Sequence, residues 1–86
     1  MDKYDYVFRW MKNATKAERH IDEMEAFAKK HPIIFWKFHR ASKGIIENDV
    51  NDEKYIKTKE DLTKLFDENE EDFKEIFDVI KTRFNY

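Results

Sequence analysis

The chain contains a single glycine and a single proline in 86 residues. These two residue types interrupt helices and mark turns, so their scarcity limits how often the chain can turn tightly. Charged residues make up 42% of the chain and hydrophobic residues 41%, and abundant Lys and Glu favour helices. A chain this short can bury one modest core. We predict an all-α fold, a compact bundle of four to five helices, in one helical domain over residues 1–86.

Two segments leave a strand alternative open. In segment 2–12, apolar residues recur at helical spacing, yet its aromatic residues also alternate as they would in a strand. Segment 33–40 has a similar ambiguity. If the rival interpretation holds, the order of elements is β-α-β-β-α and the class is α+β. The segment 2–12 has no clear partner strand, so we favour helix there.

Capping signals give the expected helix boundaries. Thr15 and Glu18 fit a capping box that begins a helix ending near Lys30, because the residue before Pro32 is pushed out of helical geometry. Pro32 suits the first turn of the next helix, and Gly44 is expected to end that helix in left-handed geometry.

The second half should contain a loop and then a long apolar stripe. Residues 47–57 are polar and predict the main loop, anchored by Tyr55 and Ile56, and Thr58 is the expected cap of the helix that follows. Asn69 leaves open whether residues 59–85 form one helix or two. The side chains expected in the core here are Phe73, Ile76, Phe77 and Ile80.

Catalytic and metal chemistry is poorly supported by the sequence. Cysteine is absent and the single glycine excludes a glycine-rich phosphate loop. Nothing resembling a nucleophile elbow surrounds Ser42, and His20 beside Glu23 reads as a solvated helix pair. The three histidines lack metal-ligand spacing. We expect no enzyme activity, no cofactor and no metal.

One loop pattern imitates a calcium site. Residues with oxygen ligands stand at the first, third, fifth, seventh and twelfth positions of an EF-hand-like loop: Asp49, Asn51, Glu53, the Tyr55 carbonyl and Glu60. Lys54 replaces the glycine that the sharp turn of such a loop needs. We therefore predict no calcium binding.

The net charge of −2 hides a strong asymmetry along the chain. Residues 1–44 carry ten Lys or Arg against six Asp or Glu, whereas residues 45–86 carry seven against thirteen. The segment 67–78 alone has seven acids and one base. It is either a mimic of nucleic acid or the solvated face of an amphipathic helix. Such asymmetry affects how a protein associates with charged partners more than it affects the fold.

The segment 29–43 interleaves cations with aromatic residues and is the predicted binding site. Its candidate contacts are Lys29, Lys30, Trp36, Lys37, Arg40 and Lys43. Cations neutralise phosphates and an exposed aromatic ring stacks on a base, which is typical of nucleic-acid binding. The alternative is that the aromatic rings are core and the cations pair with acids of the last helix.

These patterns favour a small non-enzymatic regulatory or inhibitory protein that binds a macromolecule. A protein partner is the first expectation, with Tyr6, Trp10 or Trp36 as exposed anchors; nucleic acid bound by segment 29–43 is the alternative. Head-to-tail self-association is left open. No apolar run is long enough to span a membrane, so we expect a cytoplasmic protein. The Lys-, Asn- and Ile-rich composition suits an AT-rich genome, and a phage or mobile-element origin.

Overall fold

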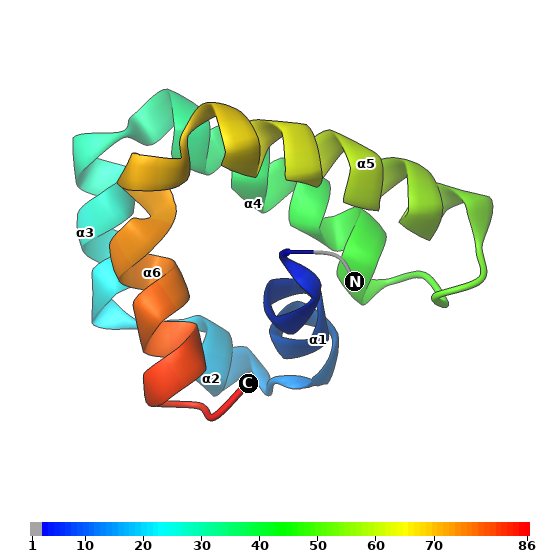
Figure 1. Cartoon of the computed structure of the whole chain (residues 1–86), viewed down its shortest axis with the longest axis horizontal. Coiled ribbons are helices and arrows are strands. Elements are labelled where there is room, and N and C mark those ends of the chain that lie inside the picture. The colour runs from blue at the N-terminus through cyan, green and yellow to red at the C-terminus, as the bar shows by residue number, and fades with distance from the viewer. Residues whose placement is uncertain (1–2) are drawn as a thin grey trace.

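The structure is a computed structural model that describes residues 3–86 (Figure 1). Helices account for 79% of it, and the described residues contain no strand. The all-α prediction is confirmed, while the expected four to five helices become six over residues 3–86. They are α1 (Asp5–Asn13), α2 (Lys16–Arg19), α3 (Asp22–Lys30), α4 (Pro32–Ile46), α5 (Glu53–Glu68) and α6 (Glu70–Thr82).

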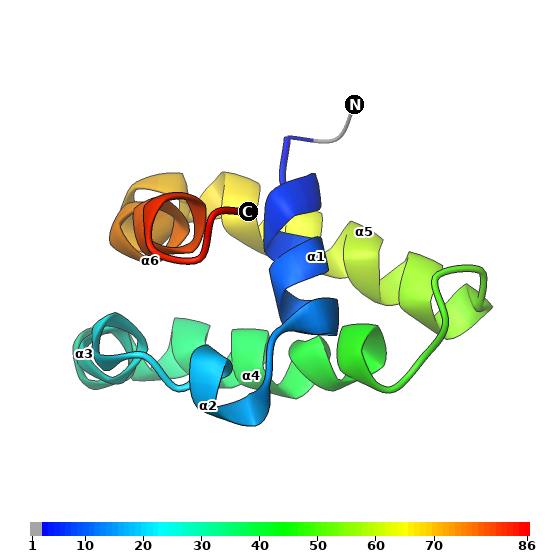
Figure 2. The same ribbon diagram turned by 90° about the horizontal axis from the view of Figure 1, so that it is seen from below.

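The helices form two layers with α1 between them (Figure 2). One layer holds α5 and α6, and the other holds α2, α3 and α4. Helix α1 contacts both layers, through α4 and α6. The centre of the core is Phe66, whose ring lies 5.0 Å from the rings of Phe73 and Phe77 and 5.1 Å from that of Tyr4, measured between centroids.

The strand alternative for segment 2–12 is wrong wherever the structure describes it; residue 2 lies outside the described residues. Helix α1 is enclosed by both layers, so its buried face is broad and includes Val7, Phe8, Trp10 and Met11, with the N-cap residue Tyr4 also buried. This explains why its aromatic residues imitate strand alternation. It also corrects one expected anchor, because Trp10 is only 1% exposed. Tyr6 is half-buried against Phe77.

The helix expected from Thr15 to Lys30 is broken in two. The capping box is present: the Glu18 amide donates to Thr15 Oγ1 and the Thr15 amide donates to Glu18 Oε1. The backbone of His20 then leaves helical geometry, with φ −97° and ψ 80°. This break lets Ile21 pack into the core at the start of α3, whereas α2 buries no residue and stays at the surface.

Helix α4 excludes the strand alternative for its segment and corrects the expectation for Gly44. Segment 33–40 is helix, with Pro32 at its first turn and the preceding His31 outside helical geometry, as predicted. Gly44 does not end the helix and has no positive φ. A Cβ atom at Gly44 would lie 2.1 Å from Thr58 Oγ1. Glycine is therefore needed there because α4 and α5 approach each other closely.

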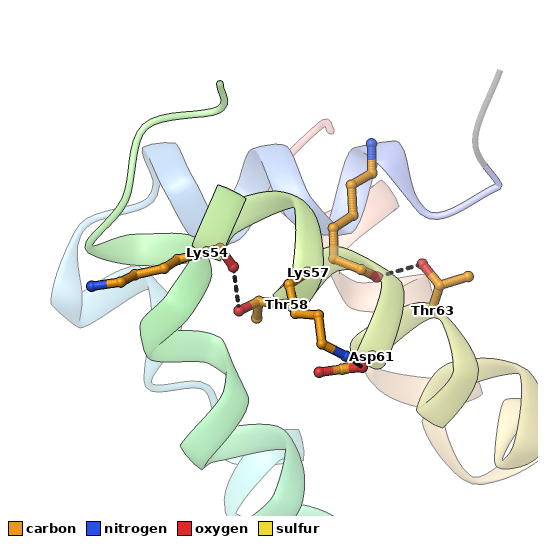
Figure 3. Close-up of polar contacts among 6 residues, drawn as sticks. Lys54, Lys57, Thr58, Asp61 and Thr63 are labelled. Carbon is orange, nitrogen blue, oxygen red and sulfur yellow. Dashed lines mark hydrogen bonds and ion pairs between the residues drawn. The ribbon is translucent and has the colours of Figure 1, made fainter. Parts of the chain in front are cut away.

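Helix α5 begins earlier than the sequence indicated, so the loop covers only residues 47–52. Its cap is Asp52, whose Oδ1 accepts a hydrogen bond from the Lys54 amide at 2.8 Å. Thr58 lies inside the helix and its hydroxyl donates to the Lys54 carbonyl at 2.7 Å (Figure 3). Tyr55 is buried as expected, but Ile56 is 48% exposed and anchors nothing in the core.

The chain breaks again at Asn69, so α5 and α6 are two helices. The Asn69 side chain donates to the Leu65 carbonyl at 2.9 Å and helps to close the end of α5. In α6 the four predicted core residues, Phe73, Ile76, Phe77 and Ile80, are all buried. Because α6 turns these apolar residues toward the core, its acidic side chains form a row on the outside of the helix.

Candidate interaction surface on α4

The outer face of α4 carries five exposed side chains at helical spacing: Ile33, Trp36, Lys37, Arg40 and Lys43. Side chains three and four residues apart lie next to each other on a helix. The opposite side buries Phe38, Ser42 and Ile45 against the core, where α4 contacts α1 and α5. The outer face therefore points away from the core.

Two large apolar side chains stand at the N-terminal end of this face. Ile33 is 71% exposed and Trp36 is 61% exposed, the highest values among the large hydrophobic residues of the described chain. They lie three residues apart, so they form one small apolar patch. Scattered exposed apolar residues are ordinary on soluble proteins, but adjacent ones mark contact surfaces more often.

The cations beside this patch have no partner among residues 3–86. Lys37, Arg40 and Lys43 make no hydrogen bond or ion pair with any described residue through their side chains. Between segment 29–43 and the acids of α6 the described residues give a single contact, in which His31 Nε2 lies 3.5 Å from Asp72 Oδ1. The interpretation in which the cations pair with the last helix is therefore wrong for these three residues.

The six predicted contacts do not form one surface. Trp36, Lys37, Arg40 and Lys43 lie together on the outer face of α4, whereas Lys29 and Lys30 end α3. Lys29 pairs locally with Glu25 at 3.6 Å. Sequence reasoning missed Ile33, although its spacing from Trp36 on the side opposite Phe38 was a usable signal.

The acids of segment 67–78 fall into two groups. Three carry interactions: Asp67 accepts from the Tyr4 hydroxyl at 2.7 Å, Glu70 accepts from Lys3 at 2.8 Å, and Asp72 faces His31. Burial and the hydrogen bond to Asp67 raise the pKa of the Tyr4 hydroxyl, and the hydrogen bond to Glu70 raises the pKa of Lys3. The side chains of Glu68, Glu71, Glu75 and Asp78 are exposed and pair with no described residue.

The calcium pattern is not assembled into a site. Residues 53–60 lie in α5, so the Tyr55 carbonyl is part of helical backbone and Glu60 is two turns from Glu53. Within residues 3–86, no group of three or more His, Asp or Glu side chains is placed to hold a metal ion.

The residues considered for catalysis have structural partners. The Ser42 hydroxyl is buried and donates to the His39 carbonyl at 2.7 Å. Glu23 accepts two hydrogen bonds from Arg83, at 2.7 and 3.3 Å, and these lower the pKa of its carboxyl group. Because Glu23 is held by Arg83, it is not positioned to work with His20.

Comparison of the chain with family models, characterised proteins and solved structures finds no match. No helix in the described part of the chain is long and apolar enough to cross a membrane. The surface on α4 must therefore be interpreted from its own side chains.

Proposed function

We propose that this chain is a small non-enzymatic binding protein that docks on another protein through the outer face of α4. The observation that supports this is the exposed Ile33–Trp36 patch beside three cations that have no partner in the described chain. A regulatory or inhibitory role would follow from occupying the partner's surface.

The composition of the face suits a protein interface. Trp and Arg are the residues most enriched among those that dominate binding energy, and such residues work best when surrounded by groups that exclude water. Trp36 supplies a large apolar surface, and Lys37, Arg40 and Lys43 supply a charged rim around it. Burying one large apolar side chain contributes about 1.5–3 kcal/mol. The matching partner surface is an apolar pocket flanked by carboxylates.

Nucleic acid fits the same face less well. Stacking on Trp36 and phosphate contacts from the three cations would favour it. However, Ile33 offers neither a stacking surface nor a charge and is the most exposed large apolar residue. The net charge of −2 also opposes a polyanion.

The test places a photo-crosslinking phenylalanine analogue at position 33 of the full chain in cells that express it. We expect a crosslinked protein that disappears when Lys37, Arg40 and Lys43 are all changed to Glu. The matched control changes Lys16, Lys54 and Lys64 to Glu; these lysines are exposed, form no side-chain hydrogen bond or ion pair with described residues, and lie off the face. The control should retain the crosslinked protein.

Two results would contradict the proposal. The first is no protein adduct at position 33, or an adduct that survives reversal of the three cations. The second is binding of a 20-nucleotide single strand or duplex by purified protein at 150 mM salt that the face variant loses and the control keeps. Because phosphate contacts weaken steeply with salt, that second result would assign the face to nucleic acid.

A further inference from the structure

We propose that a second copy of this chain is a partner of the α4 face, and that it binds through a hollow between α3 and α6. This inference rests on the proposed function, because it uses the same face. A second copy fits by charge and by shape, because the basic face of α4 and an acidic hollow are both present on one molecule.

The hollow has a volume of about 270 Å³, room for one aromatic side chain. Apolar atoms of Ala26, Phe27 and Ile76 line it. Its ionisable groups are four carboxylates, two lysines and one histidine: Glu23, Glu71, Asp72, Glu75, Lys30, Lys74 and His31. An apolar floor within a net acidic rim complements Trp36, which stands among cations on α4.

The carboxylates available to a second copy are those without a partner. Glu23 is held by Arg83 and Asp72 faces His31. Glu71 and Glu75 pair with no described residue, and Asp78 continues the same row along α6. The row from Glu71 to Asp78 is about 10 Å long, and the row from Lys37 to Lys43 on α4 is about 9 Å long, at ~1.5 Å per residue. The two rows of opposite charge therefore match in length.

These two rows cannot satisfy each other within one molecule. Helices α4 and α6 belong to different layers (Figure 2), and the outer face of α4 points away from the core. The small net charge of −2 opposes association of two copies only weakly. A contact between two copies would pair the cations of α4 in one copy with the acids of α6 in the other.

The inferred contact places Trp36 of one copy over the hollow of the other. Lys37, Arg40 and Lys43 then lie along Glu71, Glu75 and Asp78. Exposed ion pairs are weakened by salt because the Debye length is ~10 Å at 0.1 M and ~3 Å at 1 M. Association should therefore be strong at low salt and lost at high salt.

The test uses a charge swap, with mass measured by sedimentation equilibrium from 5 µM to 1 mM protein. The face variant carries Lys37→Glu, Arg40→Glu and Lys43→Glu. The hollow variant carries Glu71→Lys, Glu75→Lys and Asp78→Lys. In 50 mM salt we expect the wild-type mass to rise above 10.6 kDa with concentration. Each variant alone should stay monomeric, and their equimolar mixture should associate again because both contacts regain opposite charges.

Trp36 provides a readout that does not need either charge variant to fold. Trp10 is buried and Trp36 is exposed, so acrylamide should quench mainly Trp36 in the monomer. Quenching of wild-type protein should decrease as association proceeds and return in 500 mM salt. The change Trp36→Ala should weaken association by at least tenfold, while the variant with Lys16, Lys54 and Lys64 changed to Glu should associate as wild type does.

The inference is overturned if wild-type protein remains at 10.6 kDa up to 1 mM in 50 mM salt. It is also overturned if the mixture of folded swap variants stays monomeric, or if association persists unchanged in 500 mM salt. A monomeric chain whose position 33 still crosslinks to another protein would remove the self-association and leave the proposed function standing. A chain that self-associates and whose position 33 crosslinks only to a second copy would keep the self-association and exclude a different protein as the partner.

Discussion

The inner and outer sides of α4 belong to one helix but differ in burial and in their contacts with the rest of the molecule. The inner side buries Phe38, Ser42 and Ile45 against neighbouring helices, and Gly44 lets α5 approach closely. The outer side exposes Ile33 and Trp36 more than the hydrophobic effect alone would favour, and its cations have no partner in the described part of the chain. Folding therefore requires the residues of the inner side, whereas it does not require those of the outer side.

This difference separates stability from binding in one element. Substitutions on the inner side should change the free energy of unfolding strongly. Substitutions on the outer side should change association and leave that free energy almost unaltered. Single and triple substitutions measure this contrast.

The largest effect is expected at the centre of the core that the inner side of α4 helps to cover. Phe66 is 0% exposed and contacts the rings of Phe38, Phe73 and Phe77. Phe66→Ala should cost about 3–5 kcal/mol of unfolding free energy, because it leaves a cavity as well as losing buried apolar surface. Urea denaturation followed by circular dichroism measures it. A cost below about 1 kcal/mol would show that the core is not centred on Phe66.

The next effect is expected where α4 meets α5. Gly44→Ala places a Cβ atom against the Thr58 side chain and should cost about 1–3 kcal/mol through overpacking. If the space beside Gly44 were open, the same change would instead stabilise α4 by up to about 1 kcal/mol, since Ala favours helix. The sign of the change in urea midpoint therefore decides between these two roles.

A smaller effect is expected at the hydrogen bond between Tyr4 and Asp67. The pKa of Tyr4 is raised by burial and by this bond, so the folded chain keeps the hydroxyl proton to higher pH than the unfolded chain. The stability it contributes is present below about pH 10, the unfolded pKa, and is lost as pH rises further.

Tyr4→Phe removes this proton and the bond together. It should cost about 0.5–1.5 kcal/mol at pH 8, and the loss of stability between pH 8 and pH 11 should be smaller than in the wild type. Urea midpoints at the two pH values measure both effects. An equal alkaline loss in the two proteins would show that Tyr4 does not contribute to it.

The smallest effect on stability is expected on the outer side of α4. Trp36→Ala should change the unfolding free energy by less than about 0.5 kcal/mol, the usual range for exposed positions. It should also remove most of the fluorescence that acrylamide quenches, because Trp10 remains and is buried. A cost above about 2 kcal/mol would place Trp36 in the core instead.

Much of the inner architecture could be predicted from local signals. The capping box and Pro32 at the first turn depend on residues within one helical turn, and the apolar stripe of α6 repeats at helical spacing, so the sequence shows all three directly. The break at His20, the burial of Trp10 and the role of Gly44 depend on contacts with distant helices. Periodicity does not reveal such contacts.

Only part of the outer side of α4 could be predicted, because periodicity shows which residues share a face but not which contacts distant helices make. Lys37, Arg40 and Lys43 recur every three residues, and in the helix that the structure shows they lie on one face. Which aromatic residue stays outside could not be read from spacing, since Trp10 and Trp36 both lie in aromatic-rich segments. Only the packing of α1 between two layers separates them.

The central claim is that folding does not need the cations of the outer side of α4. The most direct measurement is the unfolding free energy, from urea denaturation, of the variant with Lys37, Arg40 and Lys43 changed to Glu. We predict a loss within about 1 kcal/mol, most of it from Lys43 in the last turn of α4, where a cation favours the helix dipole. A variant that unfolds, or that loses more than about 3 kcal/mol, would show that these side chains are structural and would contradict the assignment of this face to a partner.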